Sequence, residues 1–393
     1  MKFQMKTAAI AVTVACAGPA GSALAADNAS GVTVYGLIDA GFGSGRGAGG
    51  QSALEMFDGG LDTPFFGFKA KEDLGDFGEA KVILEGFFNS KTGQSGRPAP
   101  GGDVLFGREA AVEWSGSAGA IKLGRVDAPA LEPSLHFNPL GGGPTLSPFF
   151  THNFIAGIAG PGPNNETAGL LGANTFTDTQ WDNAIKLSLP TSRGVEAAIF
   201  YEFGGKAGDS GKHNIGANVE YKIGNFAVGG YIENNWVCNP IGCLVVTINP
   251  ATTPATVTTS AGSTNILAAE EKTWFIGGSY DFGFAKVYAG YDHYTLGSAT
   301  QAALSFEGGN FGSSSKLPEA GVKVPVGNAN LTLAWAATTT TLANGSDYRW
   351  ATTSLVYDYN FSKHTDGYIG AMQETLTNYS TGHLLMLGLK HKF

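Results

Sequence analysis

The sequence predicts an all-β fold, a 16-stranded antiparallel transmembrane β-barrel. From Gly31 onward, segments of about ten residues alternate apolar and polar side chains, and that length suits a tilted membrane strand. The connections between these segments are alternately short and long, as in barrels that cross an outer membrane. The closing stretch LLMLGLKHKF alternates in the same way and is typical of a strand with one lipid face and one wet face.

Sixteen segments fit this pattern, near 31–42, 63–72, 79–90, 104–114, 119–126, 181–190, 193–204, 211–223, 226–236, 271–282, 284–296, 315–325, 328–340, 347–359, 366–378 and 381–393. LGDFG, SGSAG and TSRG are among the tight turns, whereas 127–180 and 237–270 are the longest connections. A soluble β-sandwich is the alternative fold, but it gives no reason for the alternation of short and long connections. The barrel is therefore the better interpretation.

The period of two also predicts which face each residue occupies. Val34 and Ile38 are expected to face lipid, with Asp39 inside, and Val82 is expected to face lipid with Lys81 inside. A charge on the lipid face near the membrane midplane would cost roughly 2–4 kcal/mol, which enforces this assignment.

The segment LFGREAAVEWS resists this treatment. Glu109 and Glu113 share one face, while Arg108, Val112 and Trp114 share the other, so neither face is free of charge. Two explanations are open: a β-bulge that shifts the register, or a strand that lies in a subunit contact instead of in lipid.

The first residues predict export. A basic start is followed by an apolar stretch and by Ala23-Leu24-Ala25, a small-x-small cleavage site. We expect a signal peptide at 1–25 and a barrel at 26–393. No apolar run reaches the roughly 18 residues of a transmembrane helix, which leaves a soluble exported protein or a closed barrel.

Composition excludes some partners and cofactors. The formal charge is −9, so we expect no nucleic-acid partner, which would require a basic surface. The histidines show no metal-ligand spacing, and neither a metal nor another cofactor is expected. Cys238 and Cys243 lie in the 237–270 loop, where a disulfide is expected and two free thiols are the alternative.

Strand number bears on function, because eight strands leave a barrel filled with side chains whereas sixteen leave an aqueous channel. The 127–180 segment follows the fifth strand and is the candidate constriction loop. It carries no Lys or Arg, is rich in Phe, and holds four acids, Asp127, Glu132, Glu166 and Asp178.

Seven stretches resemble the Gram-negative porins of the Neisseria and Burkholderia type: VTVYGLIDAGF, FGFKAKEDLG, AKVILEGFF, LFGREAAVEWSGSAGAIKLGR, DNAIKLSLP, YNFSKHTDGYIGA and GLKHKF. The resemblance implies a homotrimer in the outer membrane, in contact with lipid and lipopolysaccharide. It also implies a third loop folded into each barrel, and a role for Phe393 as a signal to the barrel assembly machinery.

By the same resemblance, the pore-lining basic residues are Lys69, Lys81, Arg108 and Arg125, and the inward carboxylate Glu85 accompanies them. Two positions depart from the family pattern: Pro64-Phe65 replaces a Ser-Arg pair, and Gln180-Trp181 stands near another expected arginine. Strong anion selectivity is therefore not expected.

The predicted function is passive diffusion of small hydrophilic or amphipathic solutes and ions, without enzymatic activity. An acidic third loop facing Lys69, Lys81 and Arg108 would set up a transverse field across the passage. The alternatives are a selective channel for small organic acids, including aromatic ones, and a barrel enzyme or adhesin.

Overall fold

The computed structural model describes residues 31–96, 104–154, 179–204, 213–236, 246–249, 256–259, 270–297, 312–342 and 345–393. The predicted signal peptide, Glu166, Asp178, Cys238 and Cys243 lie outside the described residues. None of the helices in the described residues is long and apolar enough to cross a membrane.

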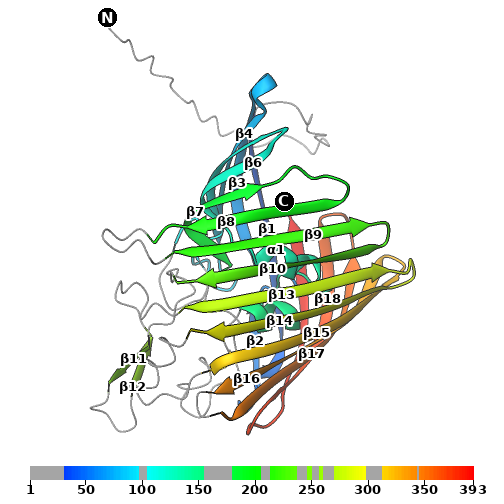
Figure 1. Cartoon of the computed structure of the whole chain (residues 1–393). Coiled ribbons are helices and arrows are strands. Elements are labelled where there is room, and N and C mark those ends of the chain that lie inside the picture. Colours follow the sequence, from blue (N-terminus) through cyan, green and yellow to red (C-terminus); the bar gives the residue numbers. More distant parts are fainter. Residues whose placement is uncertain are drawn as a thin grey trace, which may run out of the picture.

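Sixteen strands form a closed ring in which each strand is antiparallel to its two neighbours (Figure 1). They are β1 (Gly31–Arg46), β3 (Phe65–Asp73), β4 (Glu79–Phe87), β5 (Glu109–Gly116), β6 (Gly119–Asp127), β7 (Gln180–Ser188), β8 (Val195–Glu202), β9 (Asn214–Ile223), β10 (Phe226–Asn235), β13 (Glu271–Asp281), β14 (Lys286–Leu296), β15 (Gly312–Val326), β16 (Ala329–Leu342), β17 (Asp347–Asn360), β18 (Thr365–Leu376) and β19 (Gly382–Lys392). The predicted fold class and strand number are confirmed.

The described residues contain three strands besides these sixteen. The short strand β2 (Ala53–Asp58) pairs with the second half of β1. The hairpin of β11 (Val246–Asn249) and β12 (Thr256–Thr259) forms a separate sheet within the long 237–270 connection. A single 3-10 turn, η1 (Gly75–Phe77), makes the tight connection from β3 to β4.

The barrel closes where the last strand meets the first. Residues Leu37 to Arg46 of β1 pair with β19, and the backbones of Gly36 and Phe393 exchange two hydrogen bonds of 3.1 Å. Closure satisfies the backbone groups that an open sheet edge would expose to hydrocarbon, where each unsatisfied group costs several kcal/mol.

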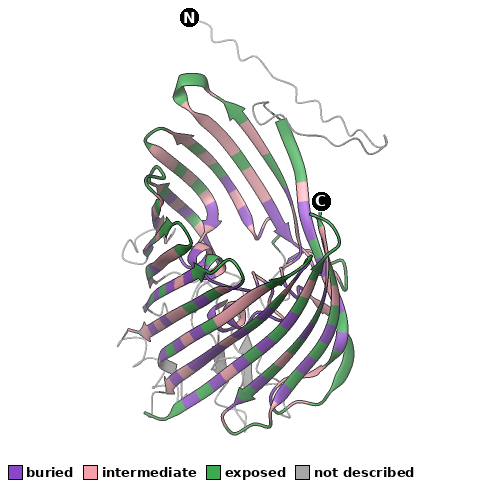
Figure 2. Cartoon of the chain, turned by 90° about the vertical axis from the view of Figure 1, so that its right-hand side faces the viewer, coloured by how far each residue is buried: buried purple, intermediate pink, exposed green. Residues whose placement is uncertain are grey.

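Side chains alternate between an exposed and a buried face along the strands (Figure 2). In β1, Val34 and Ile38 are exposed, whereas Asp39 is fully buried. Val82, Leu187 and Val219 are likewise exposed on the outer face. The predicted facing of these strands is therefore confirmed, and the outer face is a continuous apolar surface suited to lipid.

Neither explanation offered for the LFGREAAVEWS segment is needed. Strand β5 begins at Glu109, so Arg108 precedes it and is not bound by its alternation. Within β5, Val112 and Trp114 are exposed to the outside, while Glu109 is buried inside. The apparent conflict arose because the segment was started several residues too early. The pairing of β5 with β4 and β6 is continuous, so a bulge in β5 is ruled out, whereas a subunit contact on its outer face stays a prediction.

A lysine on the outer face should destabilise the barrel. Ile276 lies in the middle of β13 and is exposed to the lipid side. We expect Ile276→Lys to lower the free energy of unfolding by about 2–4 kcal/mol in lipid vesicles, because a charge must enter the hydrocarbon. Urea titration measures the loss, with Ile276→Leu as the control; equal stability of the two variants would contradict the facing of β13.

Candidate functional site on the inner wall and third loop

The third loop, between β6 and β7, lies against the inner wall of the barrel. Its described part contains two short helices, α1 (Leu131–His136) and α2 (Pro148–Phe154). Helix α1 contacts β9 and β10, and α2 contacts β16 and β17. In Figure 1, α1 appears within the ring of strands, behind β9 and β10. The loop therefore reaches across the lumen to the wall.

Polar contacts hold α1 against β7, β9 and β10. The Lys186 ammonium donates to the Glu132 carboxylate at 2.6 Å, and the Ala130 backbone N–H donates to Glu233 at 2.8 Å. Burial opposes ionisation of Glu132, but the charge and hydrogen bond of Lys186, together with Lys122 and Asn218, outweigh burial and lower the pKa of Glu132. At the end of α1, the His136 ring contacts the Glu220 carboxylate at 2.7 Å, and this hydrogen bond raises the pKa of His136.

Helix α2 is attached through a buried histidine. The His152 ring lies 3.7 Å from the Trp350 ring in a stacked arrangement, and its two nitrogens contact the hydroxyls of Thr338 and Thr352 at 2.7 and 2.9 Å. Burial lowers the pKa of His152 to about 3, so the ring is neutral at physiological pH. The neighbouring Asn153 amide donates to Glu319 at 2.9 Å.

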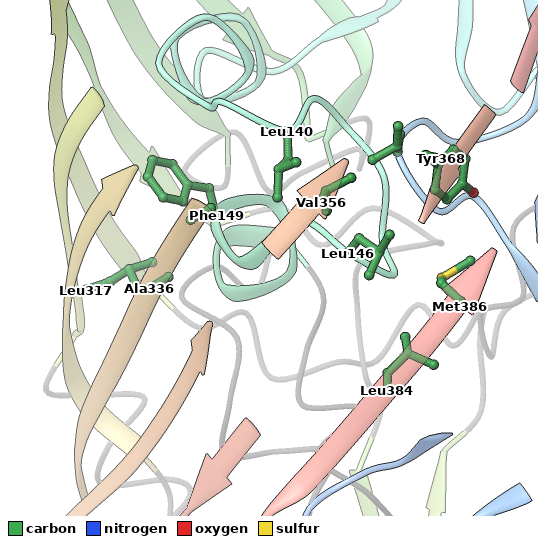
Figure 3. Packing of buried hydrophobic residues seen from close by; sticks show 11 residues of the cluster. Leu140, Leu146, Phe149, Leu317, Ala336, Val356, Tyr368, Leu384 and Met386 are labelled. Carbon is green, nitrogen blue, oxygen red and sulfur yellow. The ribbon is translucent and has the colours of Figure 1, made fainter. Parts of the chain in front are cut away.

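An apolar cluster covers the inner wall from β15 to β19 (Figure 3). The loop supplies Leu140, Leu146 and Phe149, and the wall supplies Leu317, Ala334, Ala336, Val356, Tyr368, Leu384 and Met386. Leu146 is completely buried, which is worth about 1.5–3 kcal/mol for a leucine side chain. Apolar packing of this kind attaches the loop to these strands.

The wall from β3 to β7 carries acidic and basic side chains joined in pairs. A chain of contacts runs from Lys81 through Glu113 and Lys122 to Glu109, with distances of 2.9, 3.3 and 2.8 Å. Arg108 contacts Glu85 at 2.6 Å. We call these six residues, together with the Lys186–Glu132 pair, the charge ladder.

Several ladder side chains are reached by solvent. Lys81 and Arg108 are 32% and 29% exposed, and Glu132 is 41% exposed. Because this wall lies inside the closed ring, the solvent that reaches it is in the lumen. The ladder therefore borders solvent inside the barrel, beside α1.

Of the residues expected to line the pore, five come together on this wall. Lys81, Glu85, Arg108 and Glu132 belong to the ladder, and Lys69 lies 5.0 Å from the centre of the Tyr35 ring, whose hydroxyl donates to Glu85. Arg125 is buried and contacts Asp182 at 2.5 Å, and Asp127 accepts a hydrogen bond from Gln180 at 3.3 Å.

Sequence reasoning missed Glu109, Glu113 and Lys122 as pore residues, whereas the period of two in DNAIKLSLP places Lys186 inside the barrel. Glu109 and Glu113 were set aside with the strand that resisted analysis. Their inward position follows once β5 starts at Glu109, and Lys122 then faces Glu113 in the register of β5 and β6. Within the described residues, no group of three His, Cys, Asp or Glu side chains is placed to hold a metal ion.

Comparisons with known proteins agree with this architecture. A family model described as Gram-negative porin matches residues 8–379. The chain belongs to the Gram-negative porin family. An outer membrane porin protein of Bordetella pertussis is 26% identical over 383 residues, which cover 89% of this chain and 90% of that protein.

Solved porin structures share the fold. The anion-selective porin from Comamonas acidovorans has a TM-score of 0.66 at 20% identity, covering 93% of this chain and all (100%) of the other. The trimer form of OmpT from Vibrio cholerae has a TM-score of 0.61 at 11% identity, covering 93% of this chain and 100% of the other. This porin is an outer-membrane diffusion channel, and its family points to a channel rather than an enzyme.

The buried His152 predicts a pH dependence of stability. Its pKa is about 3 in the folded porin and about 6.5 when unfolded, so the unfolded state binds more protons between these values. Stability should therefore fall by at most about 1.4 kcal/mol per pH unit as the pH drops from about 6.5 towards 3.

Urea titration in lipid vesicles over this pH range measures the slope. We expect His152→Gln to be less stable at neutral pH but to show a shallower slope. The exposed His364 provides the control, because His364→Gln should keep the full slope. A wild-type slope in His152→Gln would show that another group is responsible.

Proposed function

We propose that small hydrophilic and amphipathic solutes and ions pass along the charge ladder, between the β3–β7 wall and α1. One observation supports this most directly: the ladder side chains are partly exposed to solvent, whereas the wall from β15 to β19 is covered by buried apolar packing. Glu132 contributes to the passage from the loop side, and Glu85 and Arg108 contribute from the wall.

The pairing of charges supports weak ion selectivity. The ladder contains four cationic and four anionic side chains, each within 3.3 Å of an opposite charge. Paired charges nearly cancel at the distance of a passing ion, although each still has a strong field close by. We therefore propose that the transverse field consists of local fields from ion pairs on neighbouring strands. Lys69 adds a cation that makes no ion pair among the described residues.

A selective channel for aromatic acids has less support. Phe137 and Phe149 are each 1% exposed and pack against the wall, so they offer no surface to a solute. Phe150 and Phe154 are partly exposed, with ring centres 5.1 Å apart, and could contact an amphipathic solute as it passes.

We infer that the protein is a homotrimer. The support is the trimer form of a structural neighbour and the broad apolar outer face, which offers room for both subunits and lipid. Lipopolysaccharide and the barrel assembly machinery are proposed as further partners. Phe393 is exposed at the end of the closing strand pair, where an assembly factor could contact it.

Breaking the ladder on one side should shift selectivity in a predictable direction. Lys81→Gln with Arg108→Gln leaves Glu113 and Glu85 with fewer cationic partners, so cations should gain about threefold in relative permeability, or about 0.6 kcal/mol. Glu109→Gln with Glu113→Gln should favour anions to a similar extent. Reversal potentials in a KCl gradient across planar bilayers measure both changes.

The control is Lys272→Gln. Lys272 lies at the start of β13, outside the ladder, is 62% exposed and is paired with Glu270. It should leave the reversal potential near that of wild type. Equal shifts in all three variants, or none in the ladder variants, would show that solutes do not pass the ladder.

Trimer formation predicts the pattern of single insertions. We expect each insertion into a planar bilayer to close in three equal steps, and the unheated protein to migrate as a trimer in a detergent gel. Single-step closure together with a monomeric mass by light scattering would contradict the homotrimer.

A further inference from the structure

The second barrel strand is interrupted by a segment that turns into the lumen. Strand β2 ends at Asp58 and β3 begins at Phe65, and both pair with β1. On β1, the partner of Asp58 is Ala40 and the partner of Phe65 is Leu37, so only Ile38 and Asp39 lie between these partners. The connection from β2 to β3 is longer and contains residues 59–64. The excess of residues cannot stay in the sheet, and we call residues 59–64 the inner strap.

A buried carboxylate holds the inner strap in place. Asp39 is fully buried, and one of its oxygens accepts hydrogen bonds from the backbone N–H groups of Leu61 and Asp62 at 2.7 and 2.8 Å. The other oxygen accepts from the Tyr368 hydroxyl at 2.5 Å. The Gly59 N–H donates to the Asp39 backbone carbonyl at 2.9 Å. Both oxygens of this carboxylate are thus committed to fixing the strap against β1 and β18.

Two glycines let the strap approach so closely. Gly59 has a φ of 69°, which favours glycine over other residues. At Gly60 a side chain would collide with the Tyr368 hydroxyl. A salt bridge of 3.1 Å from Lys390 to Asp62 attaches the far end of the strap to β19.

The inner strap is joined directly to the third loop. The backbone N–H groups of Thr145 and Leu146 donate to the carbonyls of Gly59 and Gly60 at 3.3 and 3.1 Å. From the other side, the Thr63 hydroxyl donates to the Gly142 carbonyl at 3.0 Å. Leu61 of the strap joins Leu140 and Leu146 of the loop in the apolar cluster. The two segments therefore lie backbone to backbone inside the barrel.

We propose that the inner strap is a second element of the constriction and that Asp39 is the positioning residue that determines where the third loop lies. Hydrogen bonds donated to Asp39 fix the strap, and the strap in turn fixes residues 142–146 of the loop. The width of the passage thus depends on a carboxylate that no permeating solute touches.

This inference rests on the proposed passage between the loop and the β3–β7 wall, but it concerns width and not charge. A loop that is less firmly held would fluctuate and widen the passage, and flux rises with pore radius. Uncharged solutes therefore test the strap, while reversal potentials test the ladder, so that failure of one proposal is distinguishable from failure of the other.

The test compares Asp39→Ala with the wild type in liposome swelling, using uncharged sugars of increasing size. We expect about a twofold rise in the uptake of a trisaccharide relative to a monosaccharide, and noisier single-channel currents, because the passage widens. Glu374→Ala is the matched control, because Glu374 is also a buried inward carboxylate but accepts from the Ala48 N–H at 3.3 Å, away from the third loop.

Two conservative variants cover the case in which Asp39→Ala fails to assemble. Thr63→Val removes the hydrogen bond to Gly142, and Tyr368→Phe removes one hydrogen bond to Asp39. Each should shift the sugar ratio in the same direction by a smaller factor. The inference would be overturned if every variant that assembles showed the same sugar ratio and current noise as the wild type and Glu374→Ala.

Discussion

The structure depends on one constraint: in a bilayer, every backbone N–H and C=O group of a strand must be hydrogen-bonded to another strand. Pairing of β1 with β19 meets this constraint by leaving the sheet without an edge. Once sixteen strands close on themselves, alternate side chains are assigned to lipid and to the lumen. The apolar exterior and the polar interior both follow from this closure, and so does a lumen too wide for wall side chains alone to fill.

The interior of the barrel is divided into two unequal environments. Along β15 to β19, the third loop and the inner strap pack apolar side chains against the wall, in the manner of a small soluble core. Along β3 to β7, paired charges remain accessible to water. The first environment positions the loop, and the second is where we propose that solutes pass. Separating these two tasks lets a rigid loop stand beside a hydrated passage.

Two of the groups that attach the loop stay in one state over the physiological range. His152 is held neutral by burial, and it bridges α2 to two strands through its ring nitrogens. The pKa of Glu132 is lowered mainly through its contact with Lys186, in spite of burial, so that the carboxylate remains charged. A neutral ring and an ion pair thus fix α2 and α1 by different means, and neither is expected to release the loop near neutral pH.

The sequence alone determined the sixteen strands, the lipid-facing side of strands such as β1 and β4, and the segment that forms the third loop, because a period of two and the alternation of turns are local properties. It also indicated Lys81, Glu85 and Arg108 as lumen residues. It did not determine the ion pairs of the ladder, since Glu113 and Lys122 meet only in the register between β5 and β6. Nor did it indicate the inner strap: GGLDTP resembles any surface loop, and only contacts with Asp39, Tyr368 and the third loop, distant in sequence, turn it inward. Local pattern specifies the wall, and long-range contacts decide what narrows the lumen.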